Sequence, residues 1–173
     1  MLKNRMVSLR LRFKKKLDAD TLFTAVRADG SFTSTTIGPA RGFGPVHDLT
    51  HYVVETSLRL NHGFLGLLAE GRNIEDFERG AKHWLPEEAL LAEAIAGQLS
   101  QDAMTRNPLN VEDFNWTIRD VLTRGPVKAT PRELSEDQLA TMRARLADLR
   151  NQWDALPAGE TLELEVSLAA RAE

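Results

Sequence analysis

Apolar and polar residues alternate strictly in two segments of the chain, one near each end. The apolar positions are Val7, Leu9, Leu11 and Phe13 in residues 5–16, and Leu162, Leu164, Val166 and Leu168 in residues 161–168. Alternation with a period of two is typical of a strand that buries one face. The polar face is basic in the first segment and acidic in the second, and opposite charges across a strand pair stabilise it by roughly 0.2–1 kcal/mol. We therefore predict that the two segments are neighbours in one sheet.

A hairpin is predicted directly after the first strand. Residues 22–27 and 32–37 are both rich in residues that favour strands, and they flank Asp29-Gly30. Asp-Gly between two such runs is a strong short-range hairpin signal. The second of these strands carries several threonines, which indicates a polar strand at the edge of the sheet.

Helical spacing of apolar residues follows, and the expected helix starts are marked by Pro45, Asn73, Pro86, Asn110 and Ser135. The last helix carries a seam formed by Leu139, Met142, Leu146, Leu149, Trp153 and Leu156. A seam of fewer than three heptads is more typical of one core helix lying on a sheet than of a coiled coil. A homodimer through the helix at residues 136–156 is the alternative.

The order of these elements predicts an α+β fold. We expect a small, mostly antiparallel sheet of three N-terminal strands and one C-terminal strand, packed with four or more helices inserted between the third and fourth strands. The chain has 173 residues, of which 42% are hydrophobic and 27% are charged. This size and composition predict one core, so residues 1–173 are expected to form a single domain.

Composition argues against several classes of protein. Cysteine is absent, which excludes disulfides and thiolate metal sites. The longest apolar run is far short of a membrane span, and the basic amino terminus lacks the apolar segment of a signal peptide. We therefore expect no membrane partner and a cytoplasmic location. A net charge of −3 argues against general affinity for nucleic acid.

One predicted helix, beginning at Gly44-Pro45, holds three of the four histidines. At about 100° per residue, its side chains fall into two groups. Leu49, Val53, Thr56 and Leu60 gather on one side, and His47, His51, Glu55, Leu58 and His62 gather on the other. The apolar side is expected to face the core, and the histidine side to face water or a cleft.

The spacing of His47 and His51 allows both rings to hold one metal ion, because residues four apart are neighbours on a helix. The His-Asp-x-x-His spacing matches the His-Glu-x-x-His helix of zinc enzymes, with Asp48 in place of the general base. Asp48 is one methylene shorter than a glutamate, so Glu55 is a second candidate for that role. The third ligand has four candidates: Glu55, His62, Glu70 and His83. Nitrogen and oxygen ligands suit zinc, iron, manganese or nickel.

The same residues also have a non-catalytic interpretation. His51 and Glu55 form an ordinary i,i+4 pair. Together with His47 and Asp48 they could form a buried polar network that joins the helix to a loop. The protein would then be an interaction or structural module without a metal.

Several segments together resemble a family of small bacterial proteins of uncharacterised function. They are the motif Phe-Gly-Pro-Val-His-Asp-Leu-Thr-His-Tyr-Val-Val-Glu at residues 43–55, the preceding hairpin, the Asn-His-Gly-Phe-Leu-Gly-Leu segment at residues 61–67, and the closing strand after Leu156-Pro157. The resemblance implies a bacterial cytosolic protein with a site centred on that motif. It implies no particular activity.

Overall fold

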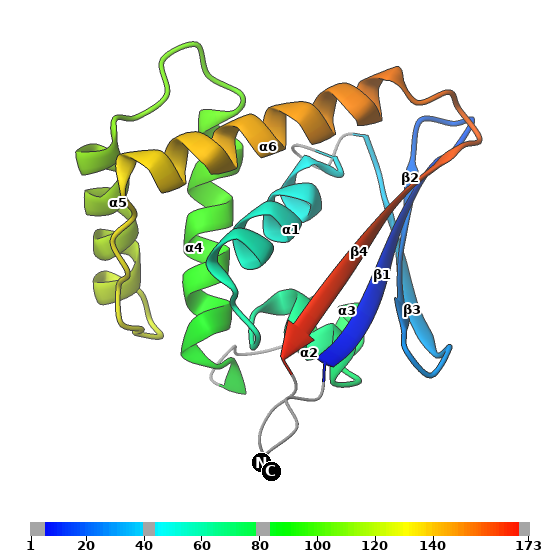
Figure 1. Cartoon of the computed structure of the whole chain (residues 1–173), viewed down its shortest axis with the longest axis horizontal. Coiled ribbons are helices and arrows are strands. Elements are labelled where there is room, and N and C mark those ends of the chain that lie inside the picture. Colours follow the sequence, from blue (N-terminus) through cyan, green and yellow to red (C-terminus); the bar gives the residue numbers. More distant parts are fainter. Residues whose placement is uncertain (1–5, 40–43, 79–83, 170–173) are drawn as a thin grey trace.

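The computed structural model describes residues 6–39, 44–78 and 84–169. The strands are β1 (Met6–Lys15), β2 (Thr21–Arg27), β3 (Phe32–Ile37) and β4 (Thr161–Ala169). The helices are α1 (Val46–Leu58), α2 (Phe64–Ala69), α3 (Ile74–Glu78), α4 (Glu87–Asp102), α5 (Val111–Arg124) and α6 (Glu136–Ala155). The helices are inserted between β3 and β4 and gather on one side of the sheet (Figure 1).

The strands form one antiparallel sheet in the order β3-β2-β1-β4. The predicted α+β fold is therefore confirmed, including the return of the last strand to the first. The register places Arg10 opposite Glu165 and Arg12 opposite Glu163. In each pair the arginine Nε lies 2.8 Å from a carboxylate oxygen. The predicted meeting of a basic strand with an acidic strand is thus observed as two exposed ion pairs.

The hairpin between β2 and β3 forms at the predicted dipeptide. Gly30 has φ of +84°, a conformation that residues with a side chain rarely adopt. The Asp29 carboxylate accepts a hydrogen bond from the backbone N–H of Ser31 at 2.9 Å. Gly30 therefore closes the turn through the freedom of its backbone, and Asp29 closes it through its side chain.

One face of the sheet is buried beneath the helices. Its buried side chains are Leu9, Leu11, Phe13, Phe23, Ala25, Val166 and Leu168. They join the apolar side chains of α1, α2, α4, α5 and α6 in one continuous core. The opposite face carries the two arginine–glutamate pairs and is exposed. The sheet therefore has one apolar face that is buried beneath the helices and one face that is exposed to solvent.

Helix α6 begins at the predicted start, Ser135, which forms a capping box with Gln138. The Ser135 hydroxyl accepts from the Gln138 backbone N–H at 3.2 Å, and the Gln138 side chain accepts from the Ser135 backbone N–H at 3.0 Å. Its apolar seam, formed by Leu139, Met142, Leu146, Leu149 and Trp153, is buried within this chain. A homodimer through α6 would therefore have to use another face of the helix.

The histidine helix is shorter than predicted. Helix α1 ends at Leu58, because Arg59 turns into the left-handed conformation with φ of +55°. His62 therefore lies beyond the helix and does not continue the face of His47 and His51. Within the described ranges, no helix is both long and apolar enough to cross a membrane.

We expect Leu11→Ala to lower the free energy of unfolding by about 2–5 kcal/mol, because this side chain is fully buried in the central strand β1. Its neighbour Arg12 points to the exposed face, so Arg12→Ala should cost less than about 1 kcal/mol. Urea unfolding followed by circular dichroism measures both. Equal costs would contradict the assignment of the two faces.

Candidate metal centre

Helix α1 presents His47 and His51 one turn apart. Their rings meet edge to face, with centroids 4.8 Å apart. His51 is only 4% exposed, whereas about a third of the His47 side chain is accessible, at 34%. The predicted pairing of these two histidines is therefore present, with one ring deep and the other at the surface.

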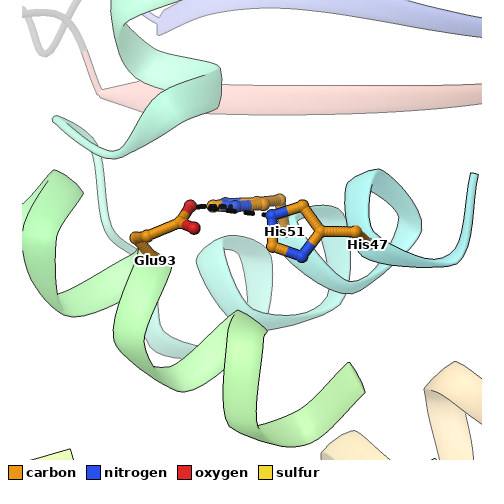
Figure 2. A group of neighbouring side chains, drawn as sticks. All are labelled: His47, His51 and Glu93. Atoms are coloured by element: carbon orange, nitrogen blue, oxygen red, sulfur yellow. Dashed lines mark hydrogen bonds and ion pairs between the residues drawn. The ribbon is translucent and has the colours of Figure 1, made fainter. Parts of the chain in front are cut away.

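Glu93 of α4 lies beside these two histidines, and the three side chains form a cluster (Figure 2). One oxygen of the Glu93 carboxylate, Oε2, lies 3.0 Å from Nε2 of His51 and 3.6 Å from Nε2 of His47. Helix α4 is held against α1 by a buried hydrogen bond of 3.0 Å from the Ser100 hydroxyl to the Thr50 hydroxyl. Glu93 and Ser100 are two helical turns apart, so both face α1.

Glu55 lies behind His51 and is completely buried. Its carboxylate accepts hydrogen bonds from the backbone N–H groups of Phe64, at 3.1 Å, and Leu65, at 2.9 Å. The same carboxylate lies 3.0 Å from Nδ1 of His51. Glu55 therefore joins α1 to the start of α2 and fixes the orientation of the His51 ring. Because it has no access to solvent, it is poorly placed for the predicted role of general base.

His51 has a carboxylate on each ring nitrogen. A neutral imidazole has one N–H and can donate to only one of them, whereas an imidazolium donates to both. Burial alone would lower the pKa of His51, but the hydrogen bonds and charges of Glu55 and Glu93 raise it to about 10. In the metal-free protein the ring is therefore held as a cation between two acids.

The three acids of the site differ in their pKa values because their surroundings differ. The contacts of Glu93 with His47 and His51 hold its pKa well below the ordinary value. Burial raises the pKa of Glu55, against the opposing effects of His51 and of the two backbone N–H groups. Burial also raises the pKa of Asp48, and the charges of His51 and His47 oppose that shift.

The remaining predicted ligands lie elsewhere or outside the described residues. His62 Nδ1 lies 3.3 Å from the carboxylate of Glu70, so these two candidates pair with each other. Neither belongs to the cluster of His47, His51 and Glu93. His83 lies outside the residues that the structure describes. The structure thus brings together two of the predicted ligands and adds Glu93, which sequence reasoning missed.

The ligating atoms of His47, His51 and Glu93 all lie within 4.8 Å of one another. Zinc bonds to these atom types measure about 2.0–2.2 Å, which places neighbouring ligands about 3–3.5 Å apart. Small side-chain rotations would bring the cluster to those separations. A cation bound there would replace the proton on Nε2 of His51, while Nδ1–H would still donate to Glu55. Histidine ligands are commonly oriented by a carboxylate in this way.

The cluster opens onto a cavity of about 310 Å³, whose wall includes His47, Asp48, His51 and Glu93. A cation bound to the cluster would therefore be accessible to a small molecule inside this cavity. Asp48, the predicted general base, faces the same space.

Comparisons with known proteins found no matching family model, no matching curated protein and no matching solved structure. The geometry of this site is therefore the basis for assigning a function.

We expect Gly63→Ala to destabilise the protein by about 1–3 kcal/mol through overpacking. A Cβ at Gly63 would lie 2.3 Å from the Glu55 carboxylate oxygen Oε2. The matched control is Gly97→Ala in α4, where a Cβ would meet nothing within 4 Å. That change should stabilise the helix by about 0.5–1 kcal/mol. Urea unfolding measures both variants, and a neutral Gly63→Ala would contradict the close packing of Glu55.

We also expect the metal-free protein to lose stability as the pH rises from about 6.5 to about 10. The pKa of His51 is raised from 6.5 to about 10 on folding, so the folded state binds more protons than the unfolded state within this window. Urea unfolding with a chelator present, at several pH values, measures the effect.

The control for this pH dependence is Glu93→Gln. It removes one of the two carboxylates that raise the His51 pKa, so the decline in stability should be smaller in total and should end at a lower pH. A free energy of unfolding that stays constant or rises across the window would contradict the charged state assigned to His51.

Proposed function

We propose that this protein binds one divalent metal ion through His47, His51 and Glu93, and uses it to activate water for the hydrolysis of a small molecule. The observation that carries the proposal is the convergence of three ligating atoms from α1 and α4 at the wall of a cavity. Glu55 supports it, because this carboxylate orients His51 from behind as a second layer around a metal would.

The ligand set fits catalytic rather than purely structural metal binding. Two histidines and one carboxylate are the protein ligands of several hydrolytic zinc sites, and they leave a coordination position for water. The same set also holds iron in some oxygen-dependent enzymes. Zinc, iron, manganese and nickel are therefore the ions to test first.

Asp48 is the proposed proton acceptor. A metal lowers the pKa of its bound water to about 7, and Asp48 lines the same cavity. Burial raises the pKa of Asp48, and a carboxylate with a raised pKa is a stronger base than an ordinary aspartate. A metal held by His47, His51 and Glu93 would supply an activated water, and the role of Asp48 would be to accept a proton from that water as it adds to a carbonyl carbon. The bond from that carbon to the leaving group then breaks, and Asp48 returns the proton to the leaving group.

A second candidate function is a non-catalytic module without a metal. The observation in its favour is that both ring nitrogens of His51 already have carboxylate partners at 3.0 Å. As an imidazolium, His51 would complete a charged network that joins α1, α2 and α4. The cluster would then serve stability, and the protein would act by binding a partner.

We further propose membership in the family of small bacterial cytosolic proteins that the motif resembles. The support is local: the segment at residues 43–55 carries His47, Asp48, His51 and Glu55, and the segment at residues 61–67 carries the backbone N–H groups that hold Glu55. The segments that resemble the family are therefore the ones that build the proposed site.

The test is metal analysis by plasma mass spectrometry after incubation with each ion and dialysis. We expect about one ion per chain, and at least a tenfold loss of affinity in Glu93→Gln and in His47→Ala, since even outer partners of a metal typically contribute 10–100-fold. Both side chains are partly exposed, at 54% and 34%, so the variants should fold.

The matched control is His62→Ala. His62 is also a half-buried histidine paired with an acid, at 32% exposure, but it lies outside the cluster. It should leave metal binding unchanged. Metal that persists in the double variant His47→Ala/Glu93→Gln would contradict the ligand set. If none of the ions binds, the second candidate function is favoured.

A further inference from the structure

The cavity beside the metal centre is polar at one end and apolar over most of its wall. The polar end is formed by His47, Asp48, His51 and Glu93. The apolar wall is contributed by the sheet and by α2, α3 and α4, through Phe23, Ile37, Phe64, Ile74, Phe77 and Ala89. A cavity that is mostly apolar with a few convergent polar groups is the usual form of a small-molecule site.

The aromatic part of this wall begins at the metal centre itself. The Phe64 ring lies 5.3 Å from the His51 ring and 4.6 Å from the Phe77 ring, measured between centroids. Phe77 in turn lies 5.6 Å from Trp84, whose side chain reaches the surface. A row of rings therefore runs from the buried histidine toward solvent, and it would contact a flat or aliphatic body along its length.

The volume limits the size of the ligand. The cavity measures about 310 Å³, the lower end of the range for small-molecule sites. At about 30 Å³ for each water-sized group, it holds about ten non-hydrogen atoms. The cavity is open to solvent on one side, so this volume sets the size of the part of a ligand that lies inside it.

The net charge at the polar end of the cavity determines which charge the ligand should carry there. With neutral histidines, a divalent ion and its Glu93 ligand carry one net positive charge at the coordination site itself, whereas Asp48 and Glu78 are carboxylates of the cavity wall outside the ligand set. A carboxylate oxygen would neutralise that charge and occupy an open coordination position. Without a metal, the acids Asp48, Glu78 and Glu93 in the same wall would instead favour a cation, which aromatic faces also attract.

Resting on the proposed metal centre, we propose that this cavity binds a small carboxylate that has an apolar body and about ten non-hydrogen atoms in all. Its carboxylate oxygen completes the metal coordination, and its body lies against Phe64 and Phe77. In a hydrolytic reaction such a carboxylate is the acid product, so the substrate would be an ester or amide of that acid.

The experiment measures binding of 3-phenylpropanoate to the protein loaded with zinc, by calorimetry, with metal content determined on the same sample. We expect saturable binding with a dissociation constant of about 10 μM to 1 mM, as ordinary for a ligand of this size. Acetate has the same head without the body, and 3-phenylpropylamine has the same body with a cationic head. Both should bind at least tenfold more weakly.

Two matched variants locate the site. Ala89→Leu fills this cavity and should weaken binding of 3-phenylpropanoate at least tenfold while the zinc content is unchanged. Ala94→Leu places the same side chain in the neighbouring cavity between α4 and α5 and should leave binding unchanged. Phe77→Ala, at a half-buried position, provides a second test and should weaken binding at least fivefold. In cobalt-loaded protein, 3-phenylpropanoate should also change the visible absorption of the metal.

Several outcomes overturn the inference, and the zinc content tells them apart from failure of the metal centre. Stoichiometric zinc with no binding of 3-phenylpropanoate, or with binding that Ala89→Leu leaves intact, refutes the ligand class but keeps the metal centre. Tighter binding of the amine refutes the charge argument. Absence of zinc refutes both proposals, even if 3-phenylpropanoate still binds to the metal-free cavity.

Discussion

The arrangement of the helices depends on one buried carboxylate. Removing an ionised glutamate from water without partners costs several kcal/mol, and Glu55 is fully buried. Its partners come from two directions: His51 one turn earlier on α1, and two backbone N–H groups at the start of α2. Satisfying this single group therefore places α2 against α1 and orients the His51 ring toward α4.

The sheet and the site have different roles. The sheet contributes to the apolar wall of the cavity and carries few of the polar groups around His47, His51 and Glu93. Those groups sit on α1 and α4, which are joined by the buried Ser100–Thr50 hydrogen bond. From the other side, Arg145 on α6 donates to the Thr56 hydroxyl at 3.0 Å. Helix α1 is thus held on several sides, and a side chain carried by a well-packed helix can be positioned more accurately than one on a loop.

Local signals in the sequence were sufficient for most of the fold. Strand alternation, the Asp29-Gly30 turn and the capping box at Ser135 depend on neighbours within a few residues, so they can be read without knowing the tertiary structure. The end of α1 could not be read in this way. Arg59 adopts a left-handed conformation, which arginine rarely does, and no glycine or proline marks that position.

The site was only half predictable for a related reason. His47 and His51 are near in sequence, and helical geometry alone brings them together. Glu93 is 42 residues from His51, and its position follows from the packing of α4 on α1. In the sequence, Glu55 and His51 look like an ordinary i,i+4 pair on a helix surface. The contacts that bury Glu55 are made by backbone N–H groups, which no side chain in the sequence reveals. Gly63, which leaves space for the carboxylate, was the one local sign of that burial.

The pairing of the first strand with the last has a consequence for how the chain is made. Arg10 and Glu165 are 155 residues apart, so on a ribosome that adds about 5–20 residues per second, β1 waits about 10–30 seconds for β4. During that interval one edge of β1 is unpaired, and such an edge can pair with other chains. Helices α1 and α4 emerge earlier, so His47, His51 and Glu93 can meet before the sheet closes. The edge of β1 that pairs with β4 is therefore the last part of the sheet to be covered during synthesis.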